Sequence, residues 1–386
     1  SLQMGQQLAV LDSQITLQPG GESPLSLTYV GLNLKTGAYR QRLDVRLTLP
    51  DGQPMAMSLR TRIQASRWKE GEADVYLSLP QSDWSKWLPE SVSQQWHFSE
   101  IKGGGELWAT WGQGVLQSAA VRLNAPQIKG AYAERKPVQI NNLALNGYFQ
   151  RSTEGMLVTL DSLAMNLGET RWESRLQLKQ LAATDKAEEA WHLQADRLEL
   201  TPLTPLLNAL APLPEGFATT VERLKVIGDL RNVLIDVRPN ATDDSKFSFA
   251  ANLDRVGFDA YHGAPAARNV SGSISGDLGH GELRMDSKDF LLHLDPIFAK
   301  PWQYIQANAR LTWKLDKEGF TLIAPYLKVL GEEGKIAGDF LIRLHFDHNQ
   351  EDYMDLRVGL VDGDGRYTAK YLPAVLSPAL DEWLRT

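Results

Sequence analysis

The chain has 386 residues, a net charge of −7 and no cysteine. Because nucleic acids and anionic headgroups bind basic surfaces, the negative charge argues against either as the main partner. The lack of cysteine excludes disulfides, Cys-ligated zinc and thiol catalysis, and it suits an oxidising compartment where a free thiol is a liability. The longest uncharged apolar stretch, residues 200–214, is too short for a membrane span and contains four prolines.

Alternation of apolar and polar residues predicts β-strands along most of the chain. The pattern is clear in residues 42–49, 175–179 and 247–253, and period two places one set of side chains on each face of a sheet. Turn signals separate such runs at Asp51-Gly52, Gly103-Gly104-Gly105, Glu318-Gly319, Glu333-Gly334 and Asp362-Gly363. Together they predict a mostly β protein of roughly 20 to 30 antiparallel strands.

Three segments depart from this alternation and predict short helices, in residues 77–89, 198–210 and 371–384. In each, a strand-like run meets a proline and the apolar residues then follow helical spacing. The apolar stripes, which we expect to brace the sheet, are Trp84, Trp87, Leu203, Leu206, Leu210, Tyr371, Val375 and Trp383. A strand run closed by a short helix would then recur in units 1–90, 91–216 and 217–386. The alternative is three unrelated linkers.

The sequence lacks the common catalytic, cofactor and metal motifs. His345 and His348 form the closest histidine pair, but their odd spacing on a strand points them to opposite faces. Residues 362–365 are typical of a hairpin turn and lack the further carboxylates of a calcium loop. No P-loop, GxGxxG or HExxH sequence occurs. We therefore expect no enzymatic activity, no cofactor and no metal.

Eleven tryptophans are a further candidate, because aromatic faces stack on sugar rings. Packing explains several of them: Trp84, Trp87 and Trp383 lie on helical stripes, and Trp313 is in register with Leu311. Core packing is the favoured interpretation, and sugar-binding platforms are the alternative.

The apolar strand faces need a cover, and the sequence offers few helices to supply one. A sheet that folds on itself would give sandwiches or barrels, whereas an open, curled sheet would need an apolar occupant. Acyl chains suit such a trough, since each buried CH₂ contributes about 0.8 kcal/mol without a specific polar contact. We favour a mostly β, elongated, curled antiparallel sheet that forms one continuous, repeating β-groove over residues 1–386. Its predicted lining is Leu43, Val45, Leu47, Val75, Leu77, Leu176, Leu178, Val233, Ile235, Val237, Phe247, Phe249, Leu311, Trp313, Ile342, Leu344, Phe346, Leu356 and Val358.

Several motifs resemble the AsmA-like family of Gram-negative envelope proteins, and within it the YhdP branch. They are Asp74–Leu79 with Trp84 and Trp87, Gly105–Gly112, Leu292–Phe298, Leu311–Lys314, Ala369–Pro373 and Asp381–Leu384. The sequence resembles the N-terminal part of that branch's long periplasmic region, beyond the inner-membrane anchor. Because the sequence begins without Met and has no secretory signal, we expect any signal or anchor to lie outside it.

This resemblance implies a bridge-like lipid transfer protein whose partner is phospholipid. Its β-groove would carry lipid between the inner and outer membranes, through the periplasm, and other parts of the protein would contact the membranes. The resemblance implies no catalytic residue. The main rival is a periplasmic scaffold of closed β-sandwiches that binds glycan or an outer-membrane protein, and an enzyme on an all-β scaffold is a weaker one.

Overall fold

The computed structural model describes residues 6–17, 24–62, 71–211, 215–261, 265–294, 298–347 and 349–371. The chain divides into two compact units. Unit 1 comprises residues 1–182 and 206–212, and unit 2 comprises residues 183–205 and 213–386. Among the described residues, no helix has the length and apolar character needed to cross a membrane.

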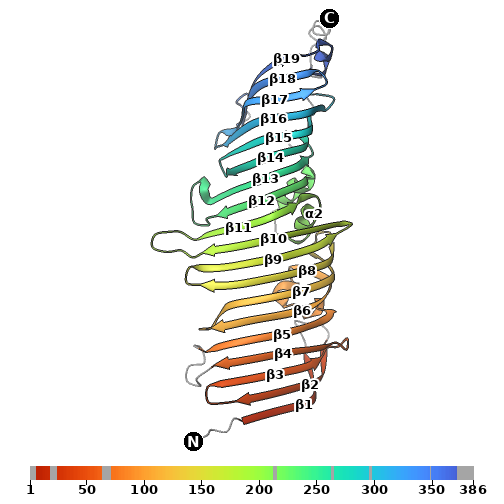
Figure 1. Ribbon diagram of the computed structural model, residues 1–386, viewed down its shortest axis with the longest axis vertical. Coiled ribbons are helices and arrows are strands. Elements are labelled where there is room, and N and C mark those ends of the chain that lie inside the picture. Colours follow the sequence, from red (N-terminus) through yellow and green to blue (C-terminus); the bar gives the residue numbers. More distant parts are fainter. Residues whose placement is uncertain are drawn as a thin grey trace. The chain divides into compact units, whose positions relative to one another are not determined.

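Ten of the described strands belong to unit 1, where they follow one another in chain order (Figure 1). They are β1 (Gln6–Leu17), β2 (Leu25–Thr36), β3 (Arg40–Thr48), β4 (Pro54–Arg62), β5 (Glu72–Asp83), β6 (Trp96–Gly112), β7 (Val115–Tyr132), β8 (Val138–Ser152), β9 (Gly155–Leu167) and β10 (Thr170–Leu181).

Nine described strands belong to unit 2. They are β11 (Ala190–Glu199), β12 (Ile227–Val237), β13 (Phe247–Phe258), β14 (Ala266–Asp277), β15 (His280–His293), β16 (Trp302–Leu315), β17 (Gly319–Gly331), β18 (Gly334–His345) and β19 (Tyr353–Val361). The described helical segments of the chain are short: η2 (Ser85–Trp87), α1 (Glu90–Ser93), α2 (Leu200–Leu210), α3 (Glu215–Leu224), η3 (Asp244–Lys246) and η4 (Gly365–Tyr371).

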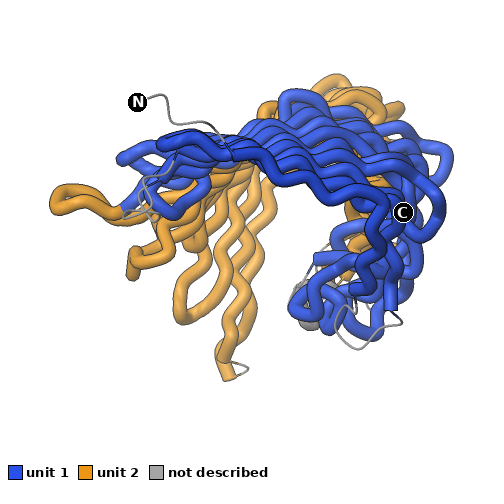
Figure 2. Tube along the Cα trace, turned by 90° about the horizontal axis from the view of Figure 1, so that it is seen from below, with its two compact units in different colours: residues 1–182, 206–212 blue, residues 183–205, 213–386 orange. Residues whose placement is uncertain are grey.

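Within each unit the strands pair antiparallel with their neighbours in sequence. In unit 1, for example, β3 and β4 place Leu43 opposite Leu59, and in unit 2, β15 and β16 place Leu283 opposite Leu311. The strands of each unit bend along their length, so that each sheet curls and stays open on one side (Figure 2). The prediction of a mostly β, curled antiparallel fold with a few short helices is therefore confirmed.

A row of β-bulges contributes to the bend in unit 2. Asn232, Arg255, Asn269 and Asp289 lie in the consecutive strands β12 to β15 and have φ values of 50°, 50°, 58° and 51°. The register between these strands shifts near the first three of these residues. A bulge adds a residue to one strand and bends it. It also reverses the alternation, so the apolar face of β15 changes from odd-numbered to even-numbered positions after Asp289.

The side chains on both sides of this bend form the main buried cluster of unit 2. Its ten buried residues are Val256, Ala267, Val270, Met285, Phe290, Tyr304, Ala307, Ala309, Val329 and Ile336. The rings of Phe290 and Tyr304 stack with centroids 6.4 Å apart. Trp302 and Tyr371 pack against the cluster. In unit 1, Leu27, Val30 and Leu49 form a smaller cluster, with the first two on β2 and Leu49 directly after β3.

The three consecutive glycines at Gly103-Gly104-Gly105 do not form the predicted turn but lie inside β6. The register of β5 and β6 is irregular between Leu79 and Ser82, opposite these glycines. A Cβ on Gly104 would lie only 2.7 Å from the Leu79 carbonyl oxygen. The glycines therefore permit a close approach of two backbones rather than a chain reversal.

The helices also differ from the prediction. Residues 77–83 belong to β5, because the alternation continues through them. The helical part of residues 77–89 is limited to η2, and α1 follows directly after that segment. The second predicted helix is present as α2, but α3 was not predicted. Of the third predicted helix, only Tyr371 lies within the described residues, as the last residue of η4.

Candidate functional site

The strands of unit 1 align their apolar residues in rows that run across the sheet. Residues directly opposite each other in paired strands share one face. One row consists of Leu34, Leu43, Leu59, Val75, Ala109, Ala119, Phe149, Val158 and Leu178. The next consists of Leu32, Val45, Met57, Leu77, Leu107, Val121, Gly147, Leu160 and Leu176. The strands β2 to β10 therefore share one apolar face.

The structure places all the predicted lining residues of unit 1 on this face. Leu43, Val45, Val75, Leu77, Leu176 and Leu178 belong to the two rows, and Leu47 lies beside them opposite Met55. Each of the seven side chains is half-buried. On the other face, Lys35 lies opposite Arg42 and Arg42 opposite Arg60, and all three are exposed. Over β2 to β4, the two faces of the unit 1 sheet thus differ sharply in polarity.

In unit 2 a comparable row crosses β11 to β19. It consists of Leu193, Ile235, Phe249, Gly276, Gly281, Trp313, Leu322, Ile342 and Met354. The Trp313 ring lies directly over Gly281, where a Cβ would come within 1.8 Å of it. The glycine is therefore required by the tryptophan packing. Val237 and Phe247 pair in an adjacent row, as do Leu311 with Leu283 and Leu356 with Phe340.

The predicted lining residues of unit 2 differ widely in exposure. Val233 is buried, at 4% exposed, whereas Ile235, Val237, Phe247, Phe249, Leu311, Trp313 and Ile342 are half-buried. The exposed fractions rise to 40% for Leu344 on β18 and 57% for Phe346 just after it, and to 52% for Leu356 and 58% for Val358 on β19. The apolar surface is thus best shielded near β12 and most accessible at the last two strands.

The predicted bracing residues have separate local roles. Trp84 and Trp87 pack on the cluster of Leu27, Val30 and Leu49, and the Trp84 indole Nε1 donates to the Gly103 carbonyl oxygen at 2.7 Å. On α2, Leu203 is buried, whereas Leu206 and Leu210 are half-buried. Tyr371 packs against the main cluster of unit 2. Val375 and Trp383 lie outside the described residues.

A buried carboxylate that sequence reasoning missed holds η4 in unit 2. Glu333, in the turn between β17 and β18, is 2% exposed. Its Oε1 accepts hydrogen bonds from Lys370 Nζ at 2.9 Å and from the Tyr371 hydroxyl. The Tyr371 hydroxyl also lies 3.1 Å from that of Tyr304. The Trp302 indole Nε1 donates to the Lys370 carbonyl oxygen at 3.2 Å, which fixes the same segment.

The electrostatics of this cluster favour an ionised Glu333 and neutral tyrosines. Burial acts to raise the pKa of Glu333, but the hydrogen bonds from Tyr371 and Lys370 outweigh it and hold the pKa below its usual range. Burial raises the pKa of Tyr304 to about 12. Burial and the hydrogen bond to Glu333 also raise the pKa of Tyr371. The cluster therefore acts as a charged anchor for η4, with no group prepared for proton transfer near neutral pH.

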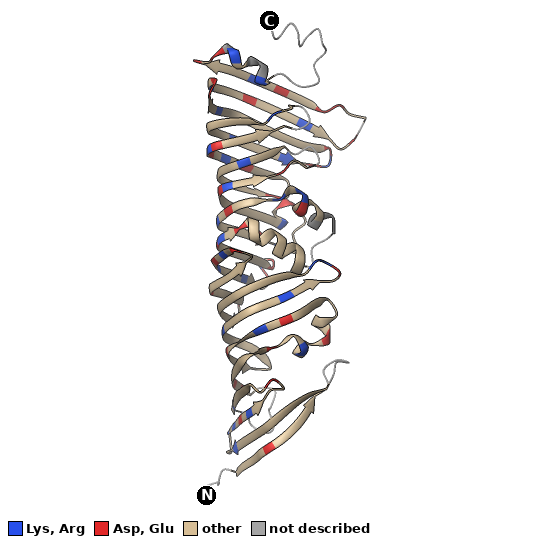
Figure 3. Cartoon of the chain, turned by 90° about the vertical axis from the view of Figure 1, so that its right-hand side faces the viewer, with Lys and Arg blue, Asp and Glu red and all other residues tan. Residues whose placement is uncertain are grey.

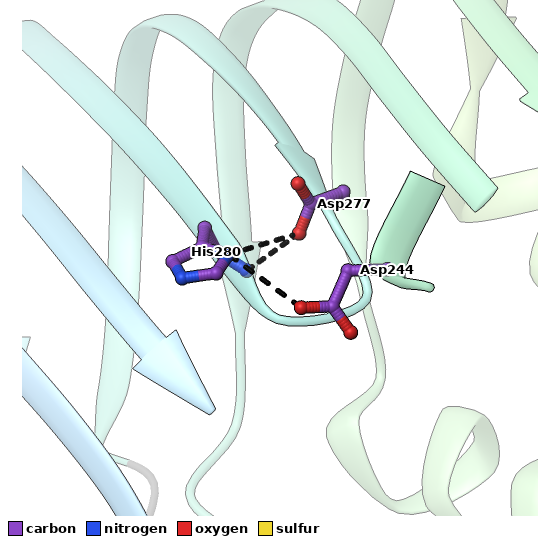
Figure 4. A group of neighbouring side chains, drawn as sticks. All are labelled: Asp244, Asp277 and His280. Carbon is purple, nitrogen blue, oxygen red and sulfur yellow. Dashed lines mark hydrogen bonds and ion pairs between the residues drawn. The ribbon is translucent and has the colours of Figure 1, made fainter. Parts of the chain in front are cut away.

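One group of described side chains has a geometry that could hold a metal ion. Asp244 on η3 and Asp277 and His280 at the turn between β14 and β15 point toward one another (Figure 4). His280 Nδ1 lies 3.5 Å from Asp277 Oδ1 and 3.8 Å from Asp244 Oδ2. Asp277 Oδ1 already accepts the backbone N–H groups of Gly279 and His280, at 2.8 and 2.7 Å. Asp277 thus stabilises the hairpin turn itself.

The sequence prediction missed two kinds of apolar residue. Met57 and Leu107 complete the unit 1 rows, and the alternation of β4 and β6 could have identified both. Val256 and Phe290 lie beyond bulges, where the alternation changes phase. The signal for the bulges is the polar residue that breaks the pattern, since Asn and Asp tolerate positive φ better than most residues.

Three comparisons with known proteins bear on this site. A family model described as YhdP protein matches residues 1–386. The "Intermembrane phospholipid transporter YhdP" of Escherichia coli (strain K12) is 21% identical over an alignment of 375 positions that covers 94% of this chain and 29% of that relative. The chain thus spans less than a third of the relative's length. No solved structure matches.

Proposed function

Because the chain belongs to the YhdP family, we propose that its apolar faces bind the acyl chains of phospholipids. The chain would be one section of a non-enzymatic conduit that carries lipid between the inner and outer membranes of a Gram-negative envelope. It would act in the periplasm, and parts of the protein outside this sequence would anchor it and contact the membranes. The observation that supports this best is the pair of apolar rows across β2 to β10.

The chemistry of these rows suits an acyl chain better than a polar ligand. The residues at their centre, such as Leu77, Leu107 and Val121, offer only apolar side chains. Each buried CH₂ contributes about 0.8 kcal/mol to binding. No polar group fixes the ligand along a row, so successive positions are nearly equivalent and a lipid could move between them. This is the behaviour expected of a conduit rather than of a storage pocket.

The same reasoning applies to the rows of unit 2, with Phe249 and Trp313 as the large side chains. Continuity of the groove through both units, and its division into the repeats 1–90, 91–216 and 217–386, are further parts of the proposal. Charged segments are interspersed along the strands of both units (Figure 3). On β3 and β4, for example, Arg42 and Arg60 lie on the face opposite to Leu43 and Leu59, which leaves the apolar face for the ligand. The rival scaffold of closed β-sandwiches has no comparable support, because each unit is an open, curled sheet.

The test is to measure phospholipid bound to the purified chain. Native mass spectrometry and lipid extraction should find copurifying phospholipid. Val121→Asp places a charge at the centre of one apolar row and should remove most of it. Ser118→Asp lies on the same strand but on the other face, so it should retain the lipid. Circular dichroism establishes that both variants fold. Absence of lipid from the unmodified chain, or equal loss from both variants, would refute the proposal.

A further inference from the structure

The polar face of unit 1 carries a row of aromatic side chains, of which Trp108 and Tyr148 are exposed and Tyr76 is half-buried. Tyr76 lies opposite Trp108, Trp108 opposite Ala120, and Ala120 opposite Tyr148. The rings of Tyr76 and Trp108 have centroids 5.5 Å apart. Trp108 is 39% exposed and Tyr148 is 52% exposed. These aromatics lie on the face opposite to the apolar rows, so the proposed lipid site does not explain them.

A broad depression of about 960 Å³ surrounds this aromatic row. Its volume lies within the range that binds small ligands. Trp108 and Tyr148 flank the small side chain of Ala120 and stand two strands apart, a separation of about 10 Å at ordinary strand spacing. Glu106, whose Oε1 accepts the Tyr76 hydroxyl at 2.9 Å, and Gln150 add polar groups to the lining. The depression thus combines two aromatic platforms with hydrogen-bonding groups.

A second depression of about 420 Å³ adjoins the first and is basic. Arg42, Arg60 and Asp74 line both. The register places Lys35 opposite Arg42, Arg42 opposite Arg60, and Arg40 opposite Arg62. Like charges directly opposite each other destabilise a sheet.

Acidic neighbours offset only part of this repulsion. Asp44 pairs with Arg42 at 2.8 Å, and Glu72 lies 3.7 Å from Arg62. The lining of the second depression still holds five basic residues against two acidic ones in a chain whose net charge is −7. This local excess of positive charge, held at a cost to the sheet, indicates a site for an anionic group.

We propose that this face of unit 1 binds a glycan that carries carboxylate groups. Sugar rings would stack on Trp108 and Tyr148, because aromatic faces pack well against the C–H faces of pyranoses. The guanidinium groups of Arg42 and Arg60 would pair with the carboxylates through charge-assisted hydrogen bonds. Aromatic platforms beside an anion site fit an acidic oligosaccharide better than a simple anion, because a simple anion would not stack on the aromatic rings. The site does not depend on lipid binding, since it uses the other face of the sheet.

The test is calorimetric titration of the 386-residue chain with two probes. One is a tetrasaccharide of alternating N-acetylglucosamine and N-acetylmuramic acid, whose muramic units carry carboxylates. The other is the neutral N-acetylglucosamine tetrasaccharide. The acidic tetrasaccharide should bind more tightly than the neutral one, and added salt should weaken its binding. Arg42→Gln combined with Arg60→Gln should reduce its affinity to that of the neutral probe.

The chain offers a matched control for the aromatic platform. Trp111 lies on β6 like Trp108 and is also 39% exposed, but it pairs with Ala73 and shares the apolar face of Ala109. Trp108→Ala should weaken binding of either saccharide about tenfold, and Trp111→Ala should leave it unchanged. No saturable binding of either saccharide, or an equal effect of the two tryptophan variants, would overturn the proposal. Binding of phosphatidylglycerol vesicles through Trp108, with no binding of either saccharide, would also overturn it.

Discussion

Strands with the same alternation form both the apolar rows of unit 1 and the cluster around Phe290 in unit 2. The two sets of side chains differ in how well other residues cover them. In unit 1, Val75, Leu77 and Leu107 are half-buried. In unit 2, Phe290 and Tyr304 are 6% and 7% exposed, and Trp302 and Tyr371 pack over them. Alternation produces an apolar face in both places, and the added cover decides whether that face becomes a core or a binding surface.

The difference in cover between the two regions should have its largest effect on the free energy of unfolding. Phe290→Ala removes a buried ring from the unit 2 cluster and should lower the free energy of unfolding by about 3–5 kcal/mol. Leu77→Ala removes a half-buried side chain from a unit 1 row and should lower the free energy of unfolding by only about 1–2 kcal/mol. Urea denaturation measures both. Equal costs for the two substitutions would show that the unit 1 rows are as well covered as the unit 2 cluster, contrary to the comparison.

The anchor of η4 gives a second, pH-dependent way to sharpen the comparison. Glu333→Gln removes the charge that pairs with Lys370 and should make the backbone amides of η4 exchange faster. The expected loss is about 2 kcal/mol, roughly thirtyfold in exchange rate. Hydrogen exchange followed by mass spectrometry measures it at neutral pH.

The direction of the pH effect follows from the lowered pKa of Glu333 in the folded chain. Its stabilisation is complete above the ordinary glutamate pKa of about 4.3 and is lost as the pH falls through the lower folded-state value. The gap between the unmodified chain and Glu333→Gln should therefore close in acid. A gap that persists unchanged at pH 3 would show that the carboxylate charge does not anchor η4.

The sequence predicts this structure well where the apolar–polar alternation continues along a strand, and poorly where a bulge shifts it by one position. Leu43, Val75 and Leu77 were correctly placed on strands because the register between β3, β4 and β5 is regular around them. Phe290 was not placed, because the bulge at Asp289 changes the phase within one strand. The Glu333 anchor joins residues nearly forty positions apart, and nothing local in the sequence marks that contact. Whether other side chains cover an apolar face depends on contacts between distant parts of the chain. The alternation alone therefore could not distinguish core residues from residues on an open surface.

The bulges of unit 2 provide the smallest predicted effect. Arg255 adopts a φ of 50°, which a β-branched residue tolerates poorly. Arg255→Val should therefore lower the free energy of unfolding by about 1 kcal/mol. Arg255→Gly should leave stability unchanged or raise it slightly, since glycine adopts positive φ without strain. Urea denaturation distinguishes the two, and equal effects would mean that backbone strain at the bulge does not contribute to the bend.

The central claim, that one face of the strands β2 to β10 holds lipid, is tested most directly by a photo-crosslinking scan along β5. A photoreactive phenylalanine analogue would replace Val75, Tyr76, Leu77 and Ser78 in turn, in cells that contain their native lipids. Val75 and Leu77 belong to the apolar rows, and Tyr76 and Ser78 lie on the other face. The account predicts phospholipid adducts at positions 75 and 77 and none at 76 and 78. Adducts at all four positions, or at none, would contradict it.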